Sequence, residues 1–459
     1  MKNPIRPIWN DLSKKGSFVQ NSAWMFASSG TSIIIQFAFF YILARIYSPA
    51  VYGLFGIFNV YSNTLGNAAT LGFSQAFVLP KTDREFTALL KLTFRVSIMI
   101  CGGFMLLTIP FGKSILSLFG HEEMGNWIYW VAPISLLIAF DRITSDWAIR
   151  NKEFKMQTVV SVSTTFVSKA YNVFHGIVIA PTVAGLVFTT IVQYVLRIST
   201  YLKFVISDTK TRWNEKVTKK ELLASAREYK GFPIYVHWAN VLNIFSNNMP
   251  AALLPLLGFS LMEVGFYVNS IVLLDIPIRL LGAGIASVFM QKATELHHNR
   301  AHELKDQTWR VFKYIVYVSS LFTFIVIIWG EKLYTLIFSE TWSQAGRAAE
   351  VLIIFYFFRM ISSPLSSLFN ILRNERASFI FQIILAIVRA LSLIFGSFYT
   401  DDFIELMLCY SIANSVMYFI YCVWIFHLIR YPLFKVISFT LLISLITIGM
   451  ALMIKWGIS

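Results

Sequence analysis

Charged residues are scarce in this sequence. Only 14% of the 459 residues are Asp, Glu, Lys or Arg, whereas 56% are apolar and 16% are aromatic. Soluble proteins carry about 25% charged residues. The composition therefore excludes an ordinary soluble protein and is typical of a membrane protein with many spans.

Cysteine is also rare. Cys101, Cys409 and Cys422 all fall inside apolar segments, which excludes a disulfide framework and a CxxC metal site. The first twenty residues are polar and basic, with no short apolar stretch before a cleavage site, so we expect no signal peptide. His298 and His302 lie one turn apart in a charged loop, where a solvated helix explains them better than a metal site.

Large external loops are missing as well. The longest, near 111–125 and 330–344, are too short for a catalytic domain. We therefore predict no enzyme activity, no catalytic residues, no metal and no cofactor. Coupling to H⁺ or Na⁺ stays open.

Apolar windows of about 20 residues recur along the whole chain, and each is long enough for a helix that crosses a bilayer. The pattern predicts an all-α polytopic membrane protein. The thirteen predicted segments are 22–46, 52–79, 87–110, 126–149, 156–180, 182–206, 231–257, 262–290, 310–329, 345–371, 377–398, 403–428 and 433–455.

The net charge of +15 is unevenly distributed along these segments. With the N-terminus in the cytoplasm, 27 of the 39 Lys and Arg fall on cytoplasmic segments, 5 on external segments and 7 within spans. Cytoplasmic loops of membrane proteins carry an excess of Lys and Arg. The asymmetry therefore predicts a cytoplasmic N-terminus, and it explains the basic charge without nucleic acid.

The two halves of the sequence resemble each other. The segment "SPAVYGLF" (48–55) aligns with "SLMEVGFY" (260–267) at an offset of 212. Arg142 follows Gly112 by 30 residues, and an arginine follows the matching glycine of the second half by 29. Repeats of this kind are common in secondary transporters.

This repeat predicts the domain organisation. We expect two six-helix lobes, 1–206 and 231–428, related by a pseudo-twofold axis along the membrane normal. A basic cytoplasmic linker, 207–230, joins them. The remaining residues, 429–459, form an additional C-terminal span that would leave the C-terminus outside.

Seven basic residues lie within the predicted spans. Arg95 and Arg142 stand about two turns from a cytoplasmic end and can extend to the headgroups, and Arg197 is ambiguous. Four cations lie deeper: Lys169, Arg279, Arg359 and Arg389. The spans contain few clear acids: Asp141, Asp146 and Asp275. We therefore predict that the four deep cations form a positive cavity for an anionic substrate, with interhelical salt bridges as the alternative.

Asparagines recur at helical spacing in two spans. Asn63 and Asn67 share one face of the second span, and Asn240, Asn243 and Asn247 share one face of the seventh. Such stripes either hold helices together or line a hydrophilic cavity. Because they occur in equivalent spans of the two lobes, we predict that these asparagines contact substrate.

An aspartate and an arginine stand inside the apolar stretch "LLDIPIRLLGAG" (273–284). Asp275 precedes Arg279 by four residues, the favoured order for an intrahelical ion pair, and Pro277 between them removes a backbone donor. We hypothesise that an anionic headgroup draws Arg279 away from Asp275, which then takes up a proton and couples loading to transport. A static ion pair is the alternative.

The stretch "YILARIYSPAVYGLFGIFNVYSNTLGNAATLGFSQAFVLP" (41–80) resembles the opening signature of the polysaccharide flippases of the Wzx type, which transport O-antigen or exopolysaccharide units. The stretch "IRNKEFK" (149–155) and the pattern of spans also resemble that family. The signature marks the wider superfamily, which includes multidrug exporters and lipid II flippases.

The resemblance implies a two-lobed transporter in the bacterial inner membrane. Its substrate would be an undecaprenyl-pyrophosphate-linked oligosaccharide, moved from the cytoplasmic to the external leaflet. Its partners would be membrane lipids and the polymerase and chain-length machinery of polysaccharide export. A multidrug or lipid II-like exporter and a non-transporting membrane assembly protein stay open as alternatives.

Overall fold

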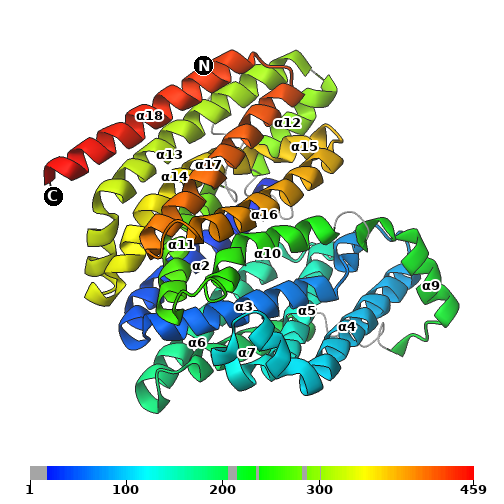
Figure 1. Ribbon diagram of the computed structural model, residues 1–459. Coiled ribbons are helices and arrows are strands. Elements are labelled where there is room, and N and C mark those ends of the chain that lie inside the picture. Colours follow the sequence, from blue (N-terminus) through cyan, green and yellow to red (C-terminus); the bar gives the residue numbers. More distant parts are fainter. Residues whose placement is uncertain (1–17, 205–213, 234–236, 282–286, 300, 459) are drawn as a thin grey trace. The chain divides into compact units, whose positions relative to one another are not determined.

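The computed structural model describes residues 18–204, 214–233, 237–281, 287–299 and 301–458. Within these ranges every regular element is a helix (Figure 1), so the predicted all-α fold is confirmed. The thirteen predicted segments correspond to α2 (Phe18–Ile46), α3 (Pro49–Ala69), α4 (Asp83–Leu118), α5 (Ile128–Arg150), α6 (Phe154–Phe174), α7 (Val183–Phe204), α10 (His237–Leu253), α11 (Leu261–Leu281), α13 (Ala301–Ile337), α14 (Ser343–Leu365), α16 (Glu375–Ser397), α17 (Phe403–Leu428) and α18 (Leu433–Ile458). Between them lie α9 (Lys219–Glu228), α12 (Ser287–Asn299) and α15 (Ser367–Ile371).

Nine spans in the described part of the chain are long and apolar enough to cross a membrane, so the protein is a multi-pass membrane protein. Four predicted spans, α2, α3, α6 and α10, are not among these nine. Ser, Thr and Asn side chains interrupt the apolar sequences of α3 and α6. For these four helices the crossing stays a prediction.

The chain divides into two compact units. The first comprises Met1–Tyr47 and Leu54–Asn248, and the second comprises Ser48–Gly53 and Met249–Ser459. Most of α10 thus groups with the first unit, although the sequence analysis assigns it to the second lobe. The predicted lobe boundaries at 206 and 231 stay a prediction.

In the first unit, a capping box fixes the start of α4. Thr82 Oγ1 accepts a hydrogen bond from the Glu85 amide at 3.3 Å, and the Glu85 carboxylate accepts one from the Thr82 amide at 3.4 Å. Two otherwise unpaired helix amides are thereby satisfied. Next to this cap lies a buried cluster that includes Phe86 and Trp147. Tyr229, at the end of α9, packs into the same cluster.

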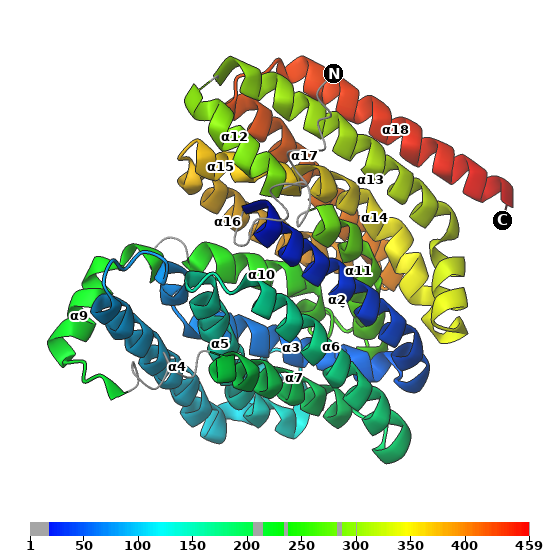
Figure 2. The same cartoon turned by 180° about the vertical axis from the view of Figure 1, so that it is seen from behind.

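In the second unit, α18 packs along α13 (Figures 1 and 2). Near its start Tyr431 stacks on Trp309 of α13, with ring centroids 5.3 Å apart. Near its end Lys455 forms an ion pair with Glu350 of α14. Glu350 is not one of the acids predicted within the spans. It stands seven residues from the start of α14, where sequence position does not separate a surface acid from a buried one.

A close crossing of two chain segments in the second unit supports the register of the internal repeat. A Cβ atom on Gly53 would lie 1.9 Å from the Leu261 carbonyl oxygen, and one on Gly265 would lie 1.9 Å from the Pro49 carbonyl oxygen. Gly53 and Gly265 are 212 residues apart, and so are Pro49 and Leu261, so the two contacts are related by the offset of the repeat. Only glycine permits this approach of backbone to backbone.

Candidate functional site

In the second unit, three side chains converge on the carboxylate of Asp275 in α11. Tyr356 Oη donates a hydrogen bond to Asp275 Oδ1 at 3.0 Å, and Arg359 Nη1 donates one at 3.4 Å. Arg279 Nη2 lies 3.9 Å from Asp275 Oδ2. The predicted pair of Asp275 and Arg279 therefore exists, but Asp275 is held more closely by α14 than by its own helix.

The three partners of Asp275 differ in exposure. The Arg279 side chain is 55% exposed, whereas that of Arg359 is 19% exposed and Tyr356 is fully buried. Tyr356 and Arg359 are three residues apart on α14 and so share a helix face. The Arg359 guanidinium lies 5.1 Å from the centre of the Tyr356 ring. Arg279 is thus the loosely held cation of the cluster, and Arg359 is the fixed one.

A buried layer of aromatic and polar side chains surrounds Arg389 of α16. Arg389 Nε donates a hydrogen bond to Asn414 Oδ1 at 2.9 Å, and Nη2 donates one to Tyr418 Oη at 2.9 Å. The Arg389 side chain is only 1% exposed. In this conformation it is enclosed between α16 and α17, within electrostatic reach of Arg359. Tyr410, also on α17, forms a hydrogen bond with Tyr267 of α11.

In the first unit, Arg142 of α5 binds the asparagine stripe of α3. Arg142 Nη1 donates a hydrogen bond to Asn67 Oδ1 at 2.7 Å, and Asn67 Nδ2 donates one to the Asn63 carbonyl at 2.8 Å. The sequence analysis expects Arg142 to extend to the headgroups. That expectation is wrong, because an amide acceptor lies within reach on the neighbouring helix.

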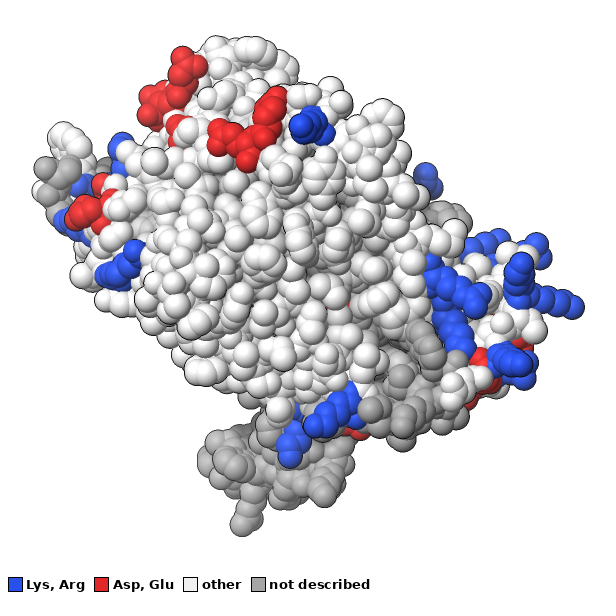
Figure 3. All heavy atoms as spheres, turned by 90° about the horizontal axis from the view of Figure 1, so that it is seen from below, with Lys and Arg blue, Asp and Glu red and all other residues white. Residues whose placement is uncertain are grey.

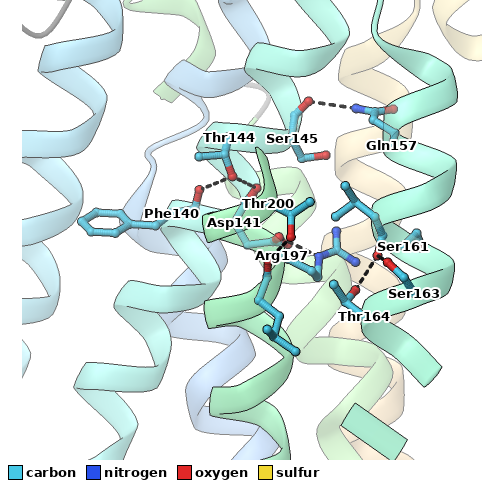
Figure 4. A network of polar contacts seen from close by, with 12 residues as sticks. Phe140, Asp141, Thr144, Ser145, Gln157, Ser161, Ser163, Thr164, Arg197 and Thr200 are labelled. Atoms are coloured by element: carbon cyan, nitrogen blue, oxygen red, sulfur yellow. Dashed lines mark hydrogen bonds and ion pairs between the residues drawn. The ribbon is translucent and has the colours of Figure 1, made fainter. Parts of the chain in front are cut away.

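A second ion pair of the first unit joins α5 to α7. Arg197 Nε lies 2.7 Å from Asp141 Oδ1, and these side chains are 20% and 12% exposed. Figure 4 shows Arg197 pointing towards Asp141, with Thr164 of α6 in the same polar network. Asp141 is the neighbour of Arg142 in the sequence. The structure instead pairs it with Arg197, because Asp141 faces α7 while its neighbour faces α3.

The remaining predicted residues of the first unit lie on other helices. Lys169 of α6 is half-buried and makes no hydrogen bond or ion pair with any residue that the structure describes. On α10, Asn247 Nδ2 donates a hydrogen bond to Asn243 Oδ1 at 2.9 Å, and Asn240 is exposed. The asparagine stripe of α10 therefore forms, as helical spacing requires.

The structure thus brings together three of the predicted residues, Asp275, Arg279 and Arg359, and the other predicted residues lie outside this cluster. Several residues of the site were not predicted from the sequence, namely Tyr356, Tyr410, Asn414 and Tyr418. A signal for the last three existed, because they are spaced by four residues on one face of α17. The described residues contain no group of His, Cys, Asp and Glu that could hold a metal ion.

The chain is similar in fold to solved transporters. One is an inward-facing multidrug resistance MATE family transporter of the MOP superfamily, with a TM-score of 0.73, 12% identity and coverage of 87% of this chain and 94% of that chain. Another is the lipid II flippase MurJ in an inward closed conformation, with a TM-score of 0.72, 16% identity and coverage of 94% and 92%. A third is a MOP superfamily transporter from Pyrococcus furiosus, with a TM-score of 0.58, 13% identity and coverage of 90% and 95%.

Identities this low show a shared fold alone, which is the transporter fold of the MOP superfamily. No curated protein gives a significant match to the sequence. A sequence profile described as "Polysaccharide biosynthesis protein" matches residues 42–347, two thirds of the chain. The chain therefore belongs to this family of polysaccharide biosynthesis proteins.

Proposed function

We propose that this protein is a flippase that moves a polyprenyl-pyrophosphate-linked oligosaccharide from the cytoplasmic to the external leaflet by alternating access. The cargo would be an O-antigen or exopolysaccharide repeat unit on undecaprenyl pyrophosphate. Membership of the polysaccharide biosynthesis family supports this proposal. The fold shared with a lipid II flippase agrees with a lipid-linked substrate.

The cluster around Asp275 is the observation that carries the proposal. One carboxylate faces two guanidinium groups, from Arg279 and Arg359, so the cluster has an excess of positive charge. A guanidinium binds a phosphate oxygen pair through two parallel hydrogen bonds. A pyrophosphate is therefore a fitting ligand for the cations of this cluster, whereas a cationic drug is not.

The difference in exposure between the two arginines suggests an order of events. Arg279 is half-exposed and 3.9 Å from Asp275, so an arriving pyrophosphate can bind it with little loss of the existing contact. Asp275 then keeps Tyr356 and Arg359, which hold α11 against α14. The Asp275 oxygen that faced Arg279 becomes free to bind H⁺ or Na⁺, which would couple loading to a change between α11 and α14.

The other predicted residues take supporting roles in this proposal. Arg389 lies near Arg359 and would add to the positive potential of the cluster. Lys169 of the first unit carries a charge with no acidic partner in the described chain, so it would face the anionic cargo. The stripes on α3 and α10, made of Asn63, Asn67, Asn240, Asn243 and Asn247, would offer amide groups to the sugar hydroxyls.

The proposed setting is the bacterial inner membrane, with the N-terminus in the cytoplasm. The charge asymmetry of the loops supports this orientation. The proposed partners are membrane lipids and, for the polymer that follows, the polymerase and chain-length machinery.

Lipid analysis of a deletion strain tests the proposal. Loss of the gene should cause undecaprenyl-linked repeat units to accumulate and surface polymer to disappear, and the intact gene should reverse both. Raised drug sensitivity without accumulation would instead support a multidrug exporter, which the MATE-like fold also accommodates. Accumulation of a peptide-bearing precursor would indicate a lipid II-like cargo, and loss of assembly of other membrane proteins would indicate an assembly factor.

A further inference from the structure

Helix α9 presents a basic surface that the proposed transport site does not use. Lys and Arg side chains gather at the right-hand edge of the face seen in Figure 3, where α9 lies. The exposed cations on and beside this helix are Lys216, Lys219, Lys220, Arg227 and Lys230.

The rotation of α9 about its axis is fixed by packing. Leu222 is buried and lies on the face towards α4, together with Tyr229 at the helix end. Lys220, Leu223 and Arg227 are spaced by three and four residues, so they share the opposite face. Leu223 is 54% exposed between these two cations. The outer face of α9 therefore carries Leu223 between basic side chains, with Glu228 as an exposed acid at the end of the helix.

Two polar contacts tie α9 and the segment before it to the start of α4. Arg84 Nε lies 2.6 Å from Glu221 Oε1, and Lys91 Nζ donates a hydrogen bond to the Glu215 carbonyl at 2.6 Å. Tyr229 joins the aromatic cluster that contains Phe86. These contacts hold α9 along the first turns of α4.

The length of α4 sets the depth of α9 in the membrane. Helix α4 has 36 residues, which correspond to about 54 Å at 1.5 Å per residue. The hydrocarbon core is only about 30 Å thick. Four of the six charged residues of α4 lie between Asp83 and Lys91, so this end of the helix extends beyond the hydrocarbon core. Helix α9, which packs there, is therefore at the depth of the lipid headgroups.

We propose that the outer face of α9 binds anionic phospholipid headgroups, with Lys219, Lys220 and Arg227 at the phosphates and Leu223 in the boundary with the acyl chains. An amphipathic helix with basic residues and an exposed leucine at this depth has the pattern of a membrane-surface helix. A protein partner fits less well, because one leucine is far less apolar area than a stable interface buries. If these cations served only to orient the protein in the membrane, they would not need to share one face of α9.

A fluorescent label on α9 in the full-length protein tests this proposal. Leu223→Cys is made in a Cys409→Ser background, since Cys409 is the exposed cysteine and the other two are buried. The labelled protein is placed in nanodiscs of phosphatidylcholine alone or with phosphatidylglycerol. We expect a blue shift of the label with phosphatidylglycerol and its loss in high salt, which screens exposed charges.

Charge variants identify the residues responsible. The triple variant Lys219→Gln, Lys220→Gln, Arg227→Gln should lose the shift. Arg227→Gln alone should raise the phosphatidylglycerol content needed for half of the shift about fivefold. The matched control, Lys113→Gln, Lys332→Gln, Arg347→Gln, removes three exposed cations far from α9 in sequence and should keep the shift. An equal emission in both lipids, or a shift that survives in a monodisperse triple variant, would overturn the proposal. Either result leaves the proposed transport function untouched.

Discussion

In each half of the chain an arginine of one helix reaches a polar side chain of another, but the acceptors differ chemically. In the first unit, Arg142 of α5 reaches the neutral amide of Asn67 on α3. In the second, Arg359 of α14 reaches the carboxylate of Asp275 on α11. By the offset of 212, Asp275 corresponds to Asn63, one turn from Asn67. An amide orients an arginine without neutralising it, whereas a carboxylate does both.

The difference suggests that the two units have different roles. Arg142 has one amide acceptor at 2.7 Å and lies four residues from Asp146, at 4.0 Å. Asp275 instead has a tyrosine, a fixed arginine and a loosely held arginine. Only the second arrangement contains a cation that an anion can remove while the carboxylate keeps other partners. We therefore expect the contacts that change when substrate binds to lie in the second unit.

Removing the carboxylate should have the largest effect. Asp275→Leu leaves the mostly buried Arg359 without its acid, and an uncompensated buried charge costs about 3–5 kcal/mol. In the first unit, Asn67→Leu removes the neutral acceptor of Arg142 and should cost about 1–3 kcal/mol. Thermal unfolding of the detergent-solubilised variants measures both, and a larger loss for Asn67→Leu would contradict the comparison.

The glycine crossing should respond equally in the two halves. Gly53→Ala and Gly265→Ala each place a Cβ atom 1.9 Å from a carbonyl oxygen, so the backbone must shift. Overpacking of this kind costs about 1–3 kcal/mol. We expect similar drops in the melting temperature for the two variants, with Gly30→Ala, whose Cβ meets no atom within 4 Å, as the control. Clearly unequal drops would argue against the repeat register.

Arg279 should matter for export and little for stability. Arg279→Gln removes a half-exposed cation at 3.9 Å, and exposed ion pairs contribute about 1 kcal/mol or less. Surface polymer should nevertheless disappear, because the first contact with the pyrophosphate is lost. The melting temperature is measured on the purified variant, and the surface polymer is measured on the strain that produces it. Normal polymer in this variant, or in one with any two of Arg279, Arg359 and Arg389 changed to Gln, would refute the cation hypothesis.

The smallest effect concerns pH and the attachment of α9. The Thr218 amide, and then the Arg84 guanidinium, lower the pKa of Glu221 to about 2. Because this pKa lies below the usual value of 4.5, the contact is fully present above about pH 4.5 and is lost as the pH falls through about 2. A label at Leu223→Cys should report release of α9 only in that acid range. Release near neutral pH would show that another group controls the attachment.

Much of the fold follows from the sequence, because a bilayer demands long apolar helices. In the described residues each of the thirteen predicted segments contains a long helix, and the stripes Asn63–Asn67 and Asn243–Asn247 lie on helix faces as their spacing requires. Contacts between helices were harder to predict. Spacing identified the pair of Asp275 and Arg279, but the closer partners on α14 depend on how two distant segments pack.

Errors in the site have the same cause. Asp141 and Arg142 are neighbours in sequence, yet one faces α7 and the other α3, so distance to a span end could not assign their roles. Arg389 was predicted from depth alone, and its acceptors Asn414 and Tyr418 come from another helix. A single sequence gives the depth of a side chain but not the neighbour that it meets.

The most direct measurement concerns the contact between Asp275 and Arg359. A charge swap of Asp275 and Arg279 is uninformative, because the new arginine would face Arg359. The double variant Asp275→Asn, Arg359→Gln instead removes both charges and keeps two groups that can hydrogen-bond. The account predicts a stable protein in the membrane, accumulated undecaprenyl-linked repeat units and no surface polymer. Restored polymer would show that the pair is only a static bridge and would contradict the account.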